Sequence, residues 1–253
     1  MNNSRPRIGI AMRLELETDR FYLSRHYSEA VAAVGGAPIH ISLIPQPAYI
    51  ESIVDGLDGV LLPGSDSDVD PVRYGREPHH ALGSVHPAKD ETDLLVLEQL
   101  EQRRIPLLAI CFGMQILNVH RGGTLIQDIP SQMPEAIKHD QGSPRDRPSH
   151  RVRLLEGSML ATLANNSGAP VNSHHHQAIE TVGSDLVATA WTADGLVEAL
   201  EDSRRDRFVV GVQWHPEYGW RNDQFSQALF TRFVTEAHQH AENTNERTVS
   251  AAT

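Results

Sequence analysis

The feature that most constrains the fold of this chain is a regular alternation of short apolar runs with segments of helical periodicity. Apolar runs of three to six residues alternate with stretches whose apolar residues recur at helical spacing, and most connections between them are short. This pattern is typical of βα units around a mainly parallel sheet. It predicts an α/β protein with strands at 8–12, 39–44, 60–62 and 107–110, and helices at 27–34, 49–54, 90–100 and 112–120.

The second half of the chain is richer in strands. An amphipathic helix is expected last, at 224–237, followed by a polar stretch of small residues. No linker rich in Ser, Gly or Pro divides the chain, so we expect one domain over residues 1–240 and a disordered tail over 241–253. The strands expected in this half are 152–155, 179–182, 186–191, 197–200 and 208–213.

Composition excludes several classes of partner. The formal net charge of −11 opposes binding to a phosphate backbone, so no nucleic-acid partner is expected. No run approaches the roughly 20 apolar residues of a membrane span, and the N-terminus lacks the apolar segment of a secretory signal. A single cysteine allows no intrachain disulfide, which favours the reducing cytoplasm. The oligomeric state is left open, and a homo-oligomer is one option.

That single cysteine, Cys111, lies where the strand 107–110 turns into the helix 112–120. Ala109 and Gly113, two residues to either side, are small, as a sharp strand-to-helix turn requires. The arrangement is the cysteine counterpart of a nucleophile elbow, in which the side chain stands above the sheet. Unpaired N–H groups at the start of the helix favour a thiolate. A buried core cysteine is the alternative interpretation.

A thiol nucleophile needs a base and a group that orients the base. His215 and Glu217 follow an apolar strand and flank Pro216. Proline favours extended geometry in the residue before it, so the two side chains can face one site. The carboxylate would fix the imidazole tautomer while the other ring nitrogen faces Cys111.

An oxyanion site needs two convergent N–H donors. The amide of Phe112 is one candidate, and the turn Pro63, Gly64, Ser65 after the third strand supplies the other. Gln115 lies one turn further along the same helix and leans back toward Cys111.

Together, four motifs resemble those of the class I glutamine amidotransferases, and within them the γ-glutamyl-γ-aminobutyrate hydrolase type (peptidase C26-like γ-glutamyl hydrolases). They are the Cys111 elbow, the turn at 63–65, the run Val171-Asn172-Ser173-His174-His175-His176-Gln177, and Trp214-His215-Pro216-Glu217. The resemblance covers about residues 8–233. It implies a flavodoxin-like three-layer αβα sandwich with a mainly parallel central sheet.

The resemblance also implies roles for individual residues. Cys111, His215 and Glu217 would form a catalytic triad. The amides of Phe112 and of Gly64 or Ser65 would hold the oxyanion, and the side chains that contact the γ-glutamyl group would be Gln115, Ser173 and His175. Three departures from the family pattern stand out: Ala109 where glycine is usual, Ser65 where many members have a second glycine, and Phe112 where arginine or leucine is frequent.

The triple histidine at 174–176 predicts no metal site, because adjacent side chains point in different directions and rarely share one ion. No cofactor is expected. The substrate is expected to be a small γ-glutamyl amine, either γ-glutamyl-γ-aminobutyrate or a γ-glutamyl polyamine, cleaved to glutamate through a thioester on Cys111. The loops 65–89 and 131–149 are expected to line the amine pocket, where Asp66, Asp68 and Asp70 form an acidic run.

Two alternatives remain open on the sequence. One is a glutaminase subunit that delivers ammonia to a separate synthase, since no synthase domain is expected after the last helix. The other is a non-catalytic binding protein on the same fold.

Overall fold

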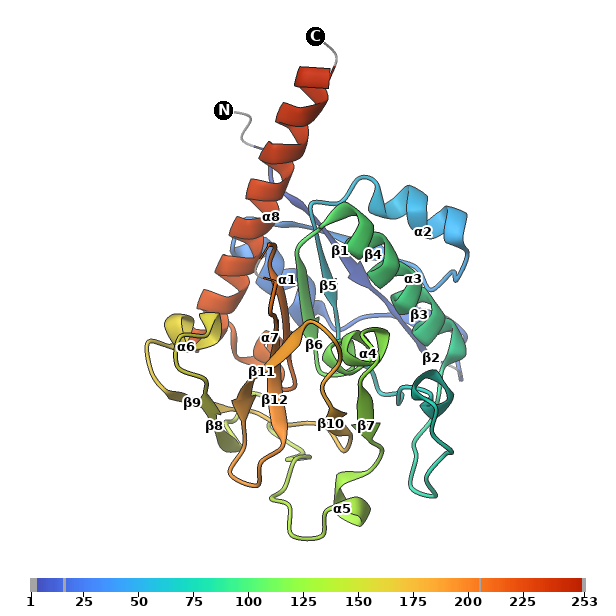
Figure 1. The fold of residues 1–253 in the computed structure, drawn as a ribbon, viewed down its shortest axis with the longest axis vertical. Coiled ribbons are helices and arrows are strands. Elements are labelled where there is room, and N and C mark those ends of the chain that lie inside the picture. The colour runs from blue at the N-terminus through green and yellow to red at the C-terminus, as the bar shows by residue number, and fades with distance from the viewer. Residues whose placement is uncertain (1–3, 16, 205, 252–253) are drawn as a thin grey trace.

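The computed structural model describes residues 4–15, 17–204 and 206–251, and for residues 245–251 it describes the backbone alone. The fold is of the expected α/β class. An 11-stranded sheet forms its centre (Figure 1). One half of the sheet is parallel, as the βα alternation predicted. Its strands, in spatial order, are β4 (Ala37–Ile41), β1 (Arg7–Ala11), β5 (Gly59–Leu62), β6 (Leu107–Ile110) and β13 (Val209–Val212).

The other half of the sheet is antiparallel and begins at β13. On one side β13 pairs in parallel with β6, and on the other it pairs antiparallel with β12. A short branch of the sheet, formed by β10 and β7, joins at β12. The antiparallel strands are β12 (Val197–Asp202), β11 (Leu186–Trp191), β8 (His150–Leu154), β9 (Gly168–Val171), β10 (Ala178–Thr181) and β7 (Thr124–Ile126).

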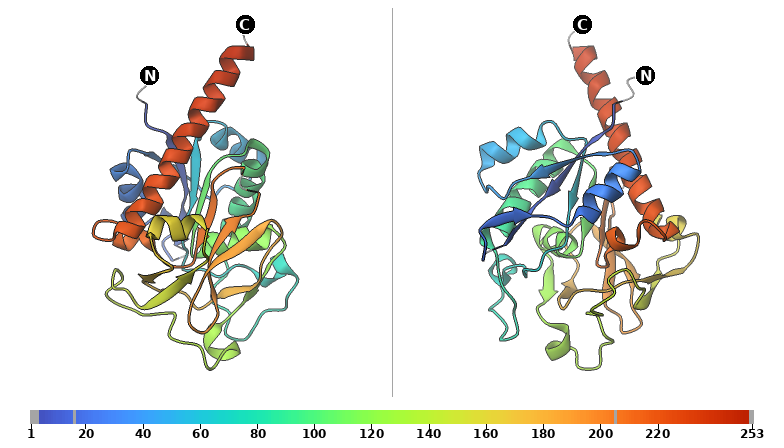
Figure 2. Two further views of the ribbon diagram at one scale, coloured as in Figure 1. Left: turned by 60° about the vertical axis from the view of Figure 1, so that its left-hand side comes forward. Right: turned by 180° about the vertical axis from the view of Figure 1, so that it is seen from behind.

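Helices cover both faces of the parallel half and complete the three layers (Figure 2). Successive residues of β6 point to opposite faces: Leu108 and Ile110 pack in one core cluster, and Leu107 and Ala109 in the other. The first cluster is shared with α1 (Arg25–Ala33) and α8 (Gln224–Ala251), and the second with α2 (Pro47–Val54), α3 (Pro87–Arg103) and α4 (Phe112–His120).

Several short elements were not expected from the sequence. They follow from local signals too brief for a periodic pattern, such as the Asp128 side chain that caps α5 and the proline at its second residue. These elements are the hairpin of β2 (Arg13–Glu15) and β3 (Arg20–Tyr22), a 3₁₀ turn (Pro71–Tyr74), α5 (Ile129–Gln132), α6 (Met159–Ala164), α7 (Pro216–Gly219), β7 and β9.

The C-terminal prediction needs correction. The sequence predicted a helix end at Ala237 and a disordered tail over 241–253, whereas the structure continues α8 to Ala251. Residues 252 and 253 of the predicted tail lie outside the described residues. No glycine or proline follows Gly219, so nothing in the sequence ends the helix. Its last turns project beyond the body of the molecule (Figure 1). Among the described residues, no helix combines the length and apolar character that crossing a membrane requires.

Candidate active site

Cys111 lies at a strained turn between β6 and α4. Its backbone has φ 53° and ψ −108°, a region that residues other than glycine rarely adopt. The turn is held by the Cys111 N–H, which donates to the carbonyl of Val212 at 2.7 Å. A Cβ at Gly113 would lie 2.2 Å from the carbonyl oxygen of Leu62, so only glycine fits the tight packing after the elbow.

His215 follows β13, and Glu217 lies in the first turn of α7. The two side chains meet through His215 Nδ1 and Glu217 Oε1, which are 2.7 Å apart and buried. Burial disfavours the imidazolium, but the charges of Glu217 and Cys111 outweigh it and raise the pKa of His215 well above its usual value. Burial likewise opposes ionisation of Glu217, yet the neighbouring His215 and Tyr27 hold the pKa of Glu217 below its usual range.

Asn172 fixes the backbone of His215. Its side-chain oxygen accepts from the His215 N–H at 2.8 Å, and its amide nitrogen donates to the His215 carbonyl at 2.8 Å. This reciprocal pair holds the residue in the extended geometry that aims its ring at Cys111. The sequence run that contains Asn172 was recognised, but this contact depends on the fold.

The turn after β5 brings its backbone close to the imidazole. A Cβ at Gly64 would lie 2.8 Å from His215 Cε1, which explains the glycine. The Gly64 N–H already donates to the Tyr27 hydroxyl at 3.1 Å, and the Gly64 carbonyl accepts from Arg13. Of the two amides considered for the oxyanion, that of Ser65 is the one with no acceptor among the described residues.

The second expected donor is the amide of Phe112. As the first residue of α4, Phe112 has no intrahelical acceptor for its N–H. Its ring points away from the pocket and is buried, with Lys89 Nζ 5.0 Å from the ring centroid. Phe112 itself is not among the residues that line the pocket at Cys111, so its part in an oxyanion site stays a prediction.

A pocket of about 580 Å³ opens at the Cys111 side chain. It brings together most of the residues predicted from the sequence: Cys111, His215, Ser65, Gln115 and His175 all line it, and Glu217 lies behind His215. The Gln115 amide donates to the carbonyl of Gln177 at 3.3 Å and to Gln213 Oε1 at 3.2 Å.

Ser173, which was expected to contact the γ-glutamyl group, is not among the residues that line this pocket. Its side chain is buried, and its hydroxyl donates to the carbonyl of His139 at 2.5 Å. Its N–H donates to Gln141 Oε1 at 2.8 Å. Ser173 therefore joins two loops.

The acidic run enters the pocket only in part. Asp66 lines it, but it accepts from the Tyr22 hydroxyl at 2.6 Å and lies 3.4 Å from Arg13. Asp68 also lines it and is 2.8 Å from His176. Asp70 instead caps the 3₁₀ turn and does not line the pocket.

The opposite wall comes from the segment between α5 and β8. Asp140 contributes a side chain that is 73% exposed. Arg145 donates to the Tyr218 hydroxyl at 2.7 Å, which places a cation at the rim. Composition alone did not single out Asp140, Arg145 or Tyr218.

The three consecutive histidines point in different directions, as expected of adjacent residues. The ring of His174 lies beside that of His215, with centroids 5.7 Å apart. His176 lies between two carboxylates, whereas His175 turns inward toward Glu198. His175 belongs to a cluster with His139, His150 and Glu198 whose ligand atoms are suited to a metal ion. The sequence did not reveal this cluster, because its members are spread over four segments.

A cysteine at a strained elbow, facing a buried His–Glu pair on a three-layer αβα fold, defines a class I glutamine amidotransferase-like hydrolase. Comparison with known families supports this class, because the model of the peptidase C26 family matches residues 6–217. The chain belongs to the peptidase C26 family.

Named relatives are similar over most of their length. A γ-glutamyl-γ-aminobutyrate hydrolase of Escherichia coli K12 is 36% identical over 250 residues, which cover 95% of this chain and 96% of the relative. A glutamine amidotransferase-like protein of Rickettsia prowazekii is 34% identical over 237 residues, which cover 78% of this chain and 83% of the relative.

A solved structure with a similar fold is that of a candidate GMP synthase component from Thermoplasma acidophilum. It has a TM-score of 0.66 and 16% sequence identity, and the match covers 95% of this chain and 98% of that chain. At this level of identity the likeness concerns the fold alone.

Proposed function

We propose that this protein hydrolyses the γ-glutamyl amide bond of a small γ-glutamyl amine, releasing glutamate and the free amine. The observation that carries the proposal is the buried His215–Glu217 pair beside the Cys111 elbow, at the end of a pocket large enough for a small substrate. The peptidase C26 match and the named hydrolases among the relatives support the same reaction class.

In the first half of the reaction, the Cys111 thiolate attacks the side-chain carbonyl carbon of the γ-glutamyl group. The amides of Ser65 and Phe112 would hold the oxyanion, a contribution of about 10² to 10³ in rate for one donor in comparable sites. The C–N bond then breaks, and the His215 imidazolium gives its proton to the departing amine. A γ-glutamyl thioester remains on Cys111.

In the second half, His215 removes a proton from water, and the resulting hydroxide attacks the thioester. The C–S bond breaks, glutamate leaves, and Cys111 returns to the thiolate. Glu217 orients the imidazole and stabilises its positive charge throughout. Every proton and electron pair comes from the chain, the substrate or water, so the scheme needs no cofactor.

We propose γ-glutamyl-γ-aminobutyrate as the leading substrate. Arg145 lines the pocket wall opposite the turn and would pair with the free carboxylate of the leaving amine. Four relatives with that activity in their names support this choice. The exposed carboxylate of Asp140 favours a γ-glutamyl polyamine as the second candidate.

The reaction is tested by glutamate release from a panel of γ-glutamyl amides: γ-glutamyl-γ-aminobutyrate, γ-glutamyl polyamines, γ-glutamyl peptides and glutamine. Cys111→Ala should lower kcat by about 10⁴-fold or more, as loss of a nucleophile does in triad hydrolases. Its melting temperature, measured in parallel, controls for folding. Full activity of Cys111→Ala would exclude the thioester.

The leaving amine is tested by changing one charge at a time. Arg145→Ala should raise KM for the γ-aminobutyrate amide and leave KM for the polyamine amide unchanged, and Asp140→Asn should do the reverse. Glutamine hydrolysis that appears only when a synthase partner is added would instead support the glutaminase alternative. A chain inactive on the whole panel, with a Cys111 that glutamine-like electrophiles do not label, would be a binding protein.

A further inference from the structure

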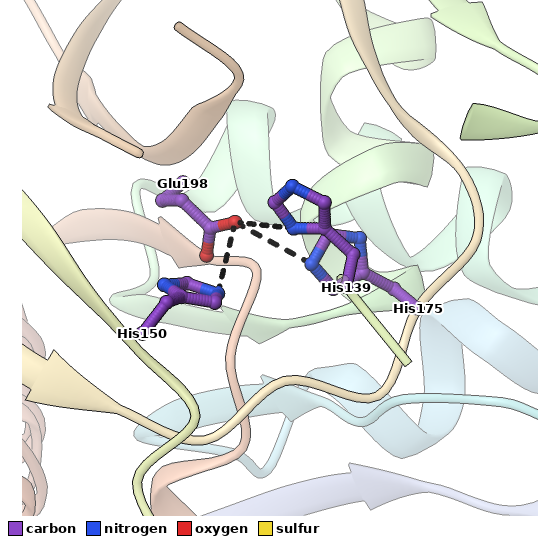
Figure 3. A group of neighbouring side chains, drawn as sticks. All are labelled: His139, His150, His175 and Glu198. Atoms are coloured by element: carbon purple, nitrogen blue, oxygen red, sulfur yellow. Dashed lines mark ion pairs between the residues drawn. The ribbon is translucent and has the colours of Figure 1, made fainter. Parts of the chain in front are cut away.

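A second group of chemically active side chains lies behind the wall of the substrate pocket. Three imidazoles and one carboxylate, from His139, His150, His175 and Glu198, point toward one another (Figure 3). They come from the segment between α5 and β8, from the start of β8, from the loop between β9 and β10, and from β12. All four side chains are buried, with exposed fractions of 0% to 6%.

The spacing of the cluster matches a tetrahedral metal centre. Glu198 Oε1 lies 3.5 Å from His139 Nδ1, 3.8 Å from His150 Nε2 and 3.4 Å from His175 Nε2. Ligand atoms about 2.0–2.2 Å from a tetrahedral zinc ion lie roughly 3.3–3.6 Å from one another. All four ligand atoms lie within 4.8 Å of one another, so small side-chain shifts would complete the coordination.

The atoms that face the centre have no hydrogen-bond partner. Among the described residues, His139 Nδ1, both nitrogens of His150, His175 Nε2 and both oxygens of Glu198 are buried and unpartnered. Leaving one such group unsatisfied costs about 1–3 kcal/mol, and more for a charged group. A cation at the centre would satisfy one nitrogen of each histidine and the carboxylate together.

In two of the histidines, the ring nitrogen that faces away from the centre of the cluster has a hydrogen-bond partner, as in known metal sites. His175 Nδ1 is 2.9 Å from the carbonyl of Gln177, so it carries the proton and leaves Nε2 as a free lone pair. His139 Nε2 is 2.9 Å from Asp194 Oδ2, which leaves His139 Nδ1 free. Metal-ligating histidines almost always donate their other N–H to a carbonyl or a carboxylate in this way.

We propose that His139, His150, His175 and Glu198 bind one divalent transition-metal ion, with Zn²⁺ as the best match to three nitrogens and one oxygen. Four protein ligands fill a tetrahedron, so the site is structural and has no open position for catalysis. The ion would tie two pocket-lining segments, 139–150 and 174–177, to β12 of the central sheet. The competing occupant of this cluster is a proton on one imidazole.

The test uses the full chain without a histidine tag, in a Cys111→Ala background that removes the thiol as a rival ligand. We expect about one equivalent of zinc by elemental analysis after gel filtration. A chelator that removes the metal should lower Tm, and added Zn²⁺ should restore it. Co²⁺ in place of Zn²⁺ should give the intense visible absorption of a tetrahedral centre.

Variants distinguish this site from incidental binding. Glu198→Gln keeps the shape of the side chain but should abolish stoichiometric Zn²⁺ binding. Asp194→Asn changes the group beside the outer nitrogen of His139, which also accepts from the Ile137 N–H and the Thr192 hydroxyl, and should weaken Zn²⁺ binding by about 10- to 100-fold. The matched control is His238→Asn, on α8 with a half-exposed side chain, and its affinity should equal that of the parent.

The proposal is overturned if the Cys111→Ala protein neither retains nor binds Zn²⁺ and its Tm is indifferent to chelator. It is also overturned if Glu198→Gln binds as tightly as the parent. Should Glu198→Gln fail to fold, the parent and Asp194→Asn measurements decide. None of these readouts involves catalysis, so the result is independent of the proposed hydrolase activity.

Discussion

At the scale of single residues, the site depends on backbone positions that tolerate one residue type. Cys111 has a positive φ, which costs of the order of 1–3 kcal/mol and persists only because neighbouring structure enforces it. Gly113 and Gly64 are the neighbours that allow the two backbones to approach. The chemistry of the site is therefore sensitive to the addition of a single methyl group.

Gly64→Ala tests this sensitivity. The new Cβ would collide with the His215 ring and displace the turn that carries the Ser65 amide, so we expect kcat to fall by about 10²-fold or more. The control is Gly219→Ala, whose Cβ would meet nothing closer than 3.6 Å and should leave kcat unchanged. Equal activity of both variants would show that the turn does not contribute to catalysis.

Asn172 offers a second test at this scale. Asn172→Ala removes both hydrogen bonds to the His215 backbone, so we expect a loss of about 10²-fold in kcat from misplacement of the imidazole. Asn172→Asp keeps the acceptor for the His215 N–H and should retain more activity than Asn172→Ala. Steady-state kinetics across pH measure kcat of both variants. Equal kcat values for Asn172→Ala and Asn172→Asp would contradict a positioning role for Asn172.

The sequence predicted Cys111, His215 and Glu217 because they stand shortly after recognisable strands, where side chains project from the edge of a sheet. Ser173 differs from these residues: its neighbours in sequence line the pocket, but its own side chain turns toward His139, which a sequence pattern does not reveal. Asn172 was recognised only as part of a run, since its role needs a contact with a residue 43 positions away.

At the scale of elements, His176 joins two loops that the sheet itself does not connect. It lies 2.8 Å from Asp68, in the loop after β5, and 3.1 Å from Asp128, which caps α5. The hydrogen bond with Asp68 raises the pKa of His176 most. Burial lowers this pKa, but the hydrogen bond with Asp128 adds to the effect of Asp68, and the pKa rises to about 9.

The raised pKa of His176 determines how the free energy of unfolding changes with pH. His176 is charged in the folded state over a wider pH range than in the unfolded chain, so its contribution is complete below about pH 6.5. The contribution is lost as the pH rises from there through about 9. We therefore expect the difference in unfolding free energy between wild type and His176→Asn to be largest at low pH and to shrink over this window.

Denaturant titrations at several pH values measure that difference. Asp68→Asn should reduce the same pH dependence, because it removes the carboxylate that contributes most. A difference that grows with pH would contradict the assignment.

Elements were predictable where many residues share one pattern. The central strands of the parallel half, β5, β6 and β13, are buried on both faces and appear as continuous apolar runs, so their positions were predicted within a few residues. β9 was missed because it contains Gly168 and Pro170, and proline is tolerated there only because β9 is an edge strand. The three-residue strands β2, β3 and β7 are too short to show alternation.

At the scale of the whole molecule, α8 fastens the C-terminal part of the chain to the sheet. Phe233 is fully buried, packs against Phe208 with ring centroids 5.7 Å apart, and faces Gly59 in β5. The expected result for Phe233→Ala is a loss of about 3–5 kcal/mol in unfolding free energy, the cost of a large core truncation. Thiol chemistry at the opposite end of the strands should be unaffected once the protein is folded.

The control is Thr231→Ala, an exposed position two residues earlier on the same helix, which should change stability by less than about 0.5 kcal/mol. Chemical denaturation of both variants measures the effect. Similar losses in the two would mean that α8 contributes through its helicity and not through its packed face.

The fold class was predictable from the sequence because it follows from periodicity, which is local. The four-residue cluster around Glu198 was not, since it depends on how the antiparallel strands and two loops assemble in space. The continuation of α8 was missed because polar composition was taken as the sign of a tail, although no residue there breaks a helix.

The residues of the pocket come from two separate parts of the fold, and this matters for redesign. Cys111 and His215 follow strands of the rigid parallel half, whereas Asp140 and Arg145 belong to a loop that ends where β8 begins. Under the proposed function, a graft that replaces residues 140–149 would exchange the surface proposed to recognise the amine and leave Cys111 and His215 in place. Loop replacement alone should then change which leaving amine the scaffold accepts.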